Sequence, residues 1–148
     1  MSTKMLTEDE FRDIYSRVPR LCADLVIETP TGLVLTLRKL DSWNNLWHLP
    51  GGTVFYKETI EQAVNRIAKE EINVQVTIKK LLGYMEFPSE EKARGFGWSI
   101  GLVVLCEIVE GQLKKNEETS DVKIFSRLPE NMIPEHVDFL KSIYPKFR

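Results

Sequence analysis

Apolar and polar positions along the chain follow two periodicities, one typical of helices and one of strands. The clearest helix is predicted over residues 58–72, where apolar side chains recur three and four positions apart. A shorter helix with a Thr-x-x-Glu capping box is expected over residues 7–18, before Pro19. A third helix is expected over residues 134–144. The helices are therefore spread along the chain rather than grouped at one end.

Strands are predicted where apolar residues alternate, or run together between turn residues. These segments are residues 21–28, 33–38, 74–87, 98–109 and 122–125. The turn at 29–32 would join the first two into a hairpin, and Glu110-Gly111 reads as a turn after the fourth. Residues 39–46 and 88–97 read as loops, and Pro50-Gly51-Gly52 as a sharp backbone feature. This mixture predicts an α+β protein or a mixed α/β sandwich.

The composition places the chain among ordinary globular proteins. The 148 residues, of which 43% are hydrophobic and 28% charged, are enough for a single domain with its own core. A formal net charge of -2 argues against a general basic surface for nucleic acid. Two cysteines, Cys22 and Cys106, are too few for a disulfide framework. With no secretory signal or membrane-spanning run expected, a cytoplasmic location is predicted.

The helix over residues 58–72 carries an acid on its apolar side. On a helical wheel Glu71 falls within the apolar stripe, and Glu70 lies at its border, four positions after Arg66. A buried carboxylate needs a cation or a metal ion as partner. Two simpler interpretations remain open: Glu71 reaches water where the helix frays, and Arg66 and Glu70 form a surface pair.

The segment before this helix favours a metal site. Gly51 and Gly52 allow the backbone to approach a ligand closely. Magnesium accepts carboxylates together with a backbone carbonyl, and it bridges to phosphate oxygens. A glycine turn followed by a helix with carboxylates is therefore a reasonable cradle for a metal–diphosphate.

The spacing of these residues resembles the Nudix box. In residues 52–74 a glycine, a glutamate, an arginine, a pair of glutamates and an aliphatic residue stand at the family's positions, namely Gly52, Glu58, Arg66, Glu70, Glu71 and Val74. The resemblance implies a single Nudix domain over residues 1–148, with an α/β/α sandwich around a mixed β-sheet. It also implies Mg²⁺ (with Mn²⁺ as a substitute) and hydrolysis of a nucleoside diphosphate linked to another group.

Two positions depart from the box. Ile67 stands where the family has a glutamate that binds metal or activates water, so fewer metals or a different base should follow. Asn73 replaces a glycine after the helix, a mild change because Asn also tolerates the left-handed conformation.

An aliphatic residue at the position of Ile67 is similar to the GDP-mannose mannosyl hydrolase branch of the family, which cleaves at the sugar carbon. Asp24 and Arg38 match positions that this branch uses at the sugar nucleotide. The branch's Gln-His pair, a metal ligand followed by a base, is replaced by Glu118 and Thr119, and its leaving-group histidine is missing. The resemblance therefore supports the Nudix fold more strongly than it supports cleavage at the sugar carbon.

The candidate roles follow from the box and this branch. Metal ligands are expected to be Gly51, Glu70, Glu71 and Glu118. Catalytic roles are assigned to Glu71, Arg66 and Glu118, substrate contacts to Asp24 and Arg38, and box-supporting roles to Gly52 and Glu58. For the base or further ligand, Glu117, Glu90 and Glu91 compete with Glu118. His48 is either a base or a histidine held structurally.

The main expectation is a cytoplasmic Mg²⁺-dependent hydrolase of a nucleoside diphosphate sugar such as GDP-mannose. One alternative is a pyrophosphohydrolase of nucleoside triphosphates or dinucleotides. Another is a nucleotide-binding module without turnover. The partner is a small nucleotide, with neither nucleic acid nor membrane, and the family resemblance implies a homodimer.

Overall fold

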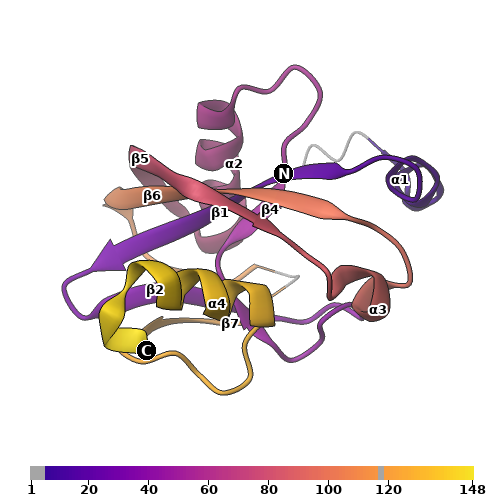
Figure 1. Ribbon diagram of the computed structural model, residues 1–148. Coiled ribbons are helices and arrows are strands. Elements are labelled where there is room, and N and C mark those ends of the chain that lie inside the picture. The colour runs from indigo at the N-terminus through magenta and orange to yellow at the C-terminus, as the bar shows by residue number, and fades with distance from the viewer. Residues whose placement is uncertain (1–5, 117–118) are drawn as a thin grey trace.

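The computed structural model describes residues 6–116 and 119–148. In these residues a mixed sheet lies between helices (Figure 1). The helices are α1 (Glu8–Tyr15), α2 (Ile60–Ile72), α3 (Glu90–Arg94), α4 (Pro134–Ile143) and the 3₁₀ helix η1 (Pro145–Phe147). The strands are β1 (Arg20–Thr29), β2 (Gly32–Arg38), β3 (Trp47–His48), β4 (Gly51–Thr53), β5 (Val74–Glu86), β6 (Ser99–Gly111) and β7 (Thr119–Phe125).

Strand β1 is central because other strands pair with it along its length. β6 runs parallel to β1 from Arg20 to Ile27, whereas β2 and β4 pair with it antiparallel. β5 pairs with the other edge of β6, and β3 and β7 pair with β2. Residues 22–27 of β1 are all buried, as expected for a strand covered on both faces.

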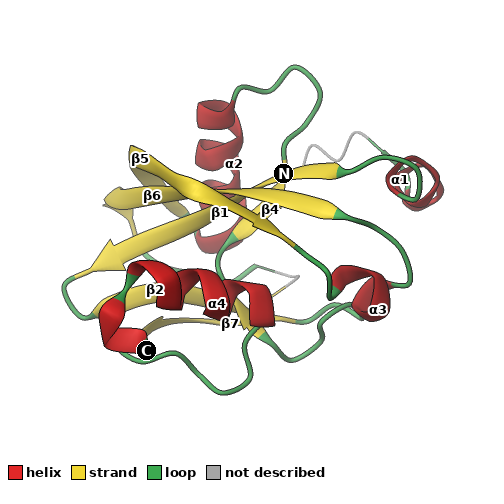
Figure 2. Cartoon of the chain, viewed as in Figure 1, coloured by secondary structure: helices red, strands yellow, loops and turns green. Residues whose placement is uncertain are grey.

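The two faces of the sheet carry separate cores. Against one face, α2 packs Val64, Ile67 and Ile72 onto residues such as Leu25 of β1 and Val104 of β6. On the opposite side, α4 contributes to a second core, so that α2 and α4 lie on either side of the sheet (Figure 2). Burial of these side chains is the main force that holds the layers together. The predicted α/β/α sandwich around a mixed sheet is confirmed.

Most predicted elements are present, and the differences arise at their ends and in short elements that the sequence did not predict. The helix predicted from Glu58 begins at Ile60, because Thr59 is the N-cap and forms a capping box with Gln62. The predicted loop 88–97 contains the short helix α3. The turn predicted at Glu110-Gly111 is wrong, because β6 continues to Gly111, which pairs with Val74 of β5.

Gly51 and Gly52 also differ from the prediction of a sharp turn. They lie in β4, where Gly51 pairs with Asp24 and Gly52 with Ala23 of β1. A side chain at Gly51 would collide with the Asp24 carboxylate. The glycine therefore allows a close strand approach rather than a turn.

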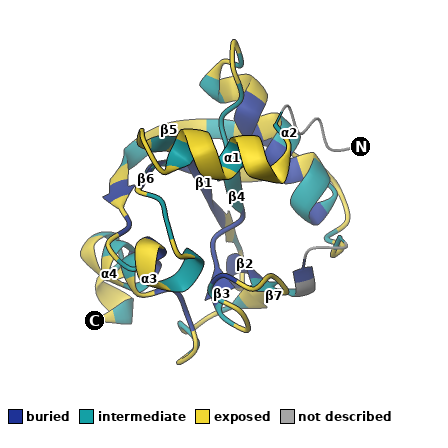
Figure 3. Cartoon of the chain, turned by 90° about the vertical axis from the view of Figure 1, so that its right-hand side faces the viewer, coloured by how far each residue is buried: buried dark blue, intermediate teal, exposed yellow. Residues whose placement is uncertain are grey.

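Helix α1 covers one end of the strands without entering the core. None of its residues is buried, and it lies at the same end of the sheet as α3 (Figure 3). The predicted capping box between Thr7 and Glu10 is present. The helix ends at Tyr15, before the predicted stop at Pro19. Within the described residues, no helix combines the length and apolar composition required to cross a membrane.

Candidate functional site

A large cleft brings most of the candidate residues together. It has a volume of about 1320 Å³ and is bordered by α1, β1, β4, α2 and the segment around Trp43. The candidates that line it are Asp24, Arg38, Gly51, Gly52, Arg66, Glu70 and Glu71. Glu58 is held behind Arg66 instead of lining the cleft, and Glu118 lies outside the described residues.

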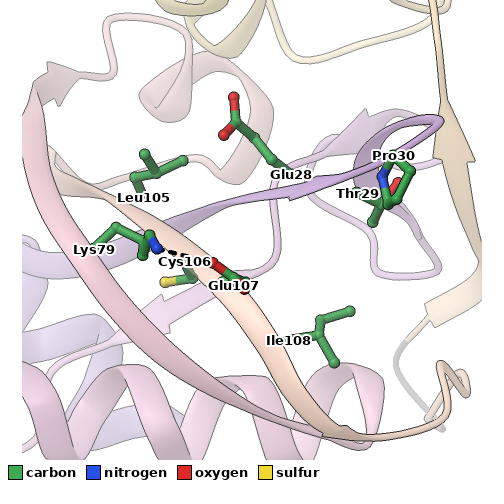
Figure 4. Close-up of a pocket in the computed structure, with 8 residues that line it drawn as sticks. All are labelled: Glu28, Thr29, Pro30, Lys79, Leu105, Cys106, Glu107 and Ile108. Carbon is green, nitrogen blue, oxygen red and sulfur yellow. Dashed lines mark ion pairs between the residues drawn. The ribbon is translucent and has the colours of Figure 1, made fainter.

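A second hollow lies elsewhere on the molecule. It is about 430 Å³ in volume and is lined by the β1–β2 turn and by β5 and β6 (Figure 4). Its Lys79–Glu107 ion pair, with an N–O distance of 2.9 Å, is about half exposed. None of the candidate residues lines this hollow, so the larger cleft is the candidate active site.

Arg66 organises the start of the box. Its Nε donates to Glu58 Oε2 at 2.7 Å, and its Nη2 donates to Glu58 Oε1 at 3.0 Å and to the Thr53 carbonyl at 2.7 Å. Its Nη1 lies 3.5 Å from Glu70 Oε2. Glu58 also accepts the Phe55 N–H, and the hydrogen bonds from Arg66 hold its pKa below the usual range. The surface-pair interpretation of Arg66 is wrong, because its side chain is only 16% exposed.

Glu70 and Glu71 lie at the C-terminal end of α2 on the cleft side. The helix does not fray there: it continues to Ile72 and ends on Asn73, whose φ of 64° is the left-handed cap expected from the sequence. Glu71 is half-buried, and its Oε2 accepts a hydrogen bond of 2.9 Å from Asn116 Nδ2. The same amide group donates to the Glu70 carbonyl at 3.0 Å. Asn116 thus orients the end of the helix that carries both carboxylates.

Ile67 fills the position of the missing glutamate with a core side chain. It is 1% exposed, and a Cβ at Gly52 would lie 3.6 Å from its Cγ1. The described residues contain no group of three His, Cys, Asp or Glu side chains arranged to hold a metal. Ile67 therefore supplies core packing, and no carboxylate, at this position of the box.

The donors that remain are of the type that magnesium prefers. In an antiparallel ladder, residue pairs that are hydrogen-bonded to each other alternate with pairs that are not. The Leu25 N–H donates to the Pro50 carbonyl, so the neighbouring pair, Asp24 and Gly51, is of the type without backbone hydrogen bonds to each other. The Gly51 carbonyl therefore points away from β1. Together with the carboxylates of Glu70 and Glu71 it supplies hard oxygen ligands, so the residues present fit Mg²⁺.

Asp24 is a buried acid in the cleft wall. Its side chain packs against Gly51 and Gly101, and a Cβ at either glycine would fall on a carboxylate oxygen. Oδ2 has no hydrogen-bond partner among the described residues, and Oδ1 lies 3.9 Å from His136 Nε2. Burial raises the pKa of Asp24 to about 7. This oxygen therefore remains available to a proton or to a hydrogen-bond donor from outside the described residues.

This raised pKa predicts a stability that falls with rising pH. An unfolded Asp titrates near about 3.9, so between about 4 and 7 the native state retains the proton more strongly and the free energy of unfolding decreases. Asp24→Asn should remove that slope and exceed the wild type at pH 8 by roughly 2–4 kcal/mol. Urea denaturation at pH 4, 6 and 8 measures the free energy of unfolding of both proteins. The same change of this free energy with pH in the wild type and in Asp24→Asn would contradict the prediction.

Two buried histidines, His48 and His136, line the same cleft as Asp24. His48 donates from Nδ1 to the Leu49 carbonyl at 2.7 Å and accepts from Thr36 Oγ1 at 3.0 Å on Nε2. Its burial lowers its pKa to about 3, which favours the structural interpretation over a base. His136 Nδ1 accepts the Leu49 N–H at 3.0 Å, so the neutral ring carries its proton on Nε2, toward Asp24.

Arg38 ends β2 at the rim of the cleft. Its Nε donates to the Ser42 carbonyl at 2.7 Å, and its Nη2 donates to Ser42 Oγ at 2.8 Å. Its guanidinium also lies 5.6 Å from the centre of the Trp43 ring. These contacts orient Arg38 at the site rather than leaving it as a mobile surface arginine.

Several site residues were not recognised from the sequence. His136 lies on the buried face of α4. Its position four residues before Leu140 places both side chains on one face of the helix, and this spacing is the signal in the sequence that indicates a buried histidine. Arg20 binds Glu90 from the start of β1, and both side chains are largely buried. Glu90 was considered only as an alternative base. No local pattern identifies Asn116, because its contact with Glu71 spans 45 positions.

Comparisons with known proteins agree with this geometry. The NUDIX domain family model matches residues 18–147. The low-salt glycan biosynthesis protein Agl8 of Haloferax volcanii is 33% identical over 135 residues, which cover 89% of this chain and 86% of that protein. An ADP-ribose pyrophosphatase of Methanocaldococcus jannaschii is 31% identical over 107 residues, which cover 72% of this chain but only 62% of that enzyme.

Solved structures share the fold. The MutT NUDIX hydrolase of Burkholderia pseudomallei superposes with a TM-score of 0.77 at 23% identity, covering 86% of this chain and 99% of that one. An ADP-ribose pyrophosphatase of Streptococcus suis gives a TM-score of 0.63 at 21% identity, covering 86% of this chain and 93% of that one. With the family match over residues 18–147 and with Gly52, Arg66, Glu70 and Glu71 of the box on one cleft, the chain belongs to the Nudix hydrolase family.

Proposed function

We propose that this Nudix hydrolase cleaves a nucleoside diphosphate sugar such as GDP-mannose with the help of Mg²⁺. The observation that carries the proposal is that Glu70 and Glu71 share one cleft with Asp24 and Arg38. The carboxylates of Glu70 and Glu71 can bind a metal ion that carries the diphosphate, and Asp24 and Arg38 can contact a polar group attached to the diphosphate. The cleft, at about 1320 Å³, is large enough for a ligand of this size.

The metal would be held by Glu70, Glu71 and the Gly51 carbonyl, with Glu118 as a further ligand by resemblance. A bound divalent cation supplies charge neutralisation of the diphosphate and a better leaving group. Arg66 holds Glu58, the Thr53 carbonyl and Glu70 in place, so it acts as a positioning residue. Mn²⁺ offers similar ligand chemistry and is expected to substitute.

In the proposed reaction, the oxygen of a water molecule bonds to the anomeric carbon of the sugar. The bond from that carbon to the phosphate oxygen breaks, and its electron pair remains on the nucleoside diphosphate. The water proton passes to a carboxylate, for which Glu71 and Glu118 are the candidates. Thr119 cannot serve as a base at neutral pH.

Attack at phosphorus is the main alternative. The name of the Methanocaldococcus relative, an ADP-ribose pyrophosphatase, supports it, whereas the glycan biosynthesis protein of Haloferax supports a sugar nucleotide. A binding module without turnover is favoured by Ile67, which removes one of the family's carboxylates.

A substrate panel in ¹⁸O-labelled water tests these alternatives. Nucleotide sugars, ADP-ribose and nucleoside triphosphates are incubated with the full chain and Mg²⁺, and the products are identified by mass spectrometry. Label in the free sugar is the expected result, label in a phosphate product indicates attack at phosphorus, and thermal stabilisation by nucleotide without any product indicates a binding module.

The proposal also covers the organisation of the protein. In this proposal, residues 1–148 form a single domain, and the protein is a cytoplasmic homodimer. Its partner is a small nucleotide, and it binds neither nucleic acid nor membrane. The near-neutral charge of -2 supports the exclusion of a general nucleic-acid surface.

A further inference from the structure

Arg94, the last residue of α3, lies among three aromatic rings in the wall of the cleft. The centre of its guanidinium is 5.6 Å from the ring of Phe11, 5.8 Å from Trp43 and 5.9 Å from Phe96. The three rings come from α1, from the segment after β2 and from the segment after α3, and all of them line the cleft. The fold thus assembles an aromatic recess beside Arg94 at the end of the sheet where α1 and α3 lie (Figure 3). Each ring also has a second guanidinium near it: Arg20 lies 5.4 Å from Phe11, Arg38 5.6 Å from Trp43 and Arg12 4.6 Å from Phe96.

The orientation of Arg94 is fixed through its Nε. This atom donates to Glu90 Oε2 at 3.1 Å, and Glu90 is 1% exposed. The same carboxylate is paired with Arg20, which also donates to Thr53 and Ser99. Glu90 therefore holds Arg94 through one nitrogen. Within residues 6–116 and 119–148, the two terminal nitrogens Nη1 and Nη2 have no hydrogen-bond partner.

The rings are held by contacts of their own. Trp43 Nε1 donates to Ser89 Oγ at 3.0 Å, and Ser89 Oγ donates to Glu135 Oε1 at 2.7 Å. Phe11 and Phe96 meet edge to face with their centroids 6.1 Å apart. A ligand entering this recess therefore meets aromatic side chains that are already positioned, and two Arg94 nitrogens that have no acceptor among the described residues.

We propose that Arg94 and these three rings read the nucleobase and select guanine over adenine. Aromatic side chains stack on the face of any base, so the rings supply affinity without choosing between purines. Two parallel N–H donors match the O6 and N7 acceptors of guanine. Adenine presents the N6 amino donor beside its N7 acceptor, so one N–H donor of Arg94 would face another donor and form no hydrogen bond. The inference rests on the proposed function, since it requires that the ligand is a nucleotide.

Binding of GDP and ADP to the full chain tests this assignment without requiring turnover. Isothermal titration in the presence of Mg²⁺ compares the wild type with Arg94→Met and Arg94→Lys. The wild type should prefer GDP, and both variants should lose roughly 5- to 150-fold in GDP affinity, the equivalent of about 1–3 kcal/mol for a bidentate base contact. ADP affinity should change little, so the preference should disappear. Arg94→Lys keeps the charge and separates its contribution from the paired geometry.

The exposed Arg127, which does not line the cleft, provides the matched control. Arg127→Met should leave both affinities unchanged, and thermal melts should show that the Arg94 variants are folded. Equal affinities of the wild type for GDP and ADP would overturn the assignment. An equal loss for both nucleotides in the variants would also overturn it, because it would place Arg94 on the phosphates.

The two proposals fail in different ways. Selective GDP binding without hydrolysis of any sugar nucleotide would leave the base assignment standing and refute the proposed reaction. Hydrolysis of GDP- and ADP-sugars at the same rate would support the reaction and refute the base assignment.

Discussion

Glu71→Gln is expected to lower kcat for the preferred nucleotide substrate by roughly 10²- to 10³-fold, corresponding to the loss of a few kcal/mol of metal-assisted stabilisation. Gln keeps the shape and can still contact the Asn116 amide, but it removes the charge that binds a cation. The Mg²⁺ concentration needed for half-maximal activity should rise as well. Steady-state kinetics over a Mg²⁺ titration measures both effects.

The same helix offers a matched control for this substitution. Glu61 lies in the first turn of α2, is exposed, and does not line the cleft. Glu61→Gln removes an identical charge and should leave kcat and the Mg²⁺ dependence unchanged. If Glu71→Gln behaved like this control, Glu71 would have no place in the mechanism.

Arg66→Met is expected to reduce the free energy of unfolding by about 2–4 kcal/mol, because it leaves partly buried acceptors without their donor. Arg66 bonds to both oxygens of Glu58 and to the Thr53 carbonyl, and the two charged side chains are 16% and 14% exposed. Chemical denaturation monitored by tryptophan fluorescence provides the measurement.

A second arginine–carboxylate pair, which is exposed, provides the matched control for this substitution. Arg17 and Asp13 approach to 3.1 Å with side chains 76% and 66% exposed. Arg17→Met should change stability by less than about 0.5 kcal/mol, since surface ion pairs contribute little. Equal losses from Arg17→Met and Arg66→Met would show that the Arg66 contacts add nothing beyond a surface pair.

The elements were predictable where the signal is local. Helix α2 follows from its apolar spacing, and the β1–β2 hairpin follows from the turn at residues 29–32. The errors concern neighbours that the local sequence does not contain. Gly51 reads as a turn residue, yet its conformation is set by pairing with Asp24, which lies far away in the chain.

The candidate site shows the same division. Glu58 and Arg66 are only eight positions apart, so the loop before α2 and the first turns of the helix bring them together. The resemblance to the box implied a role for each of them, and the structure shows their contact. The wheel also placed Glu71 toward the interior of the fold. The alternatives left open for Arg66 and Glu71, a surface pair and a frayed helix end, required solvent exposures and hydrogen bonds to decide.

By itself, the sequence determined the longer helices and strands, because these depend on side-chain spacing within one or two turns of chain. The family scaffold followed from the resemblance of residues 52–74 to the Nudix box. Only the tertiary structure decided how the cleft is completed. His136 meets Leu49 across 87 positions, and Arg20 meets Glu90 across 70. Such contacts depend on strand register and on how the helices pack against the sheet, and these arise from burial over the whole chain rather than from any local pattern.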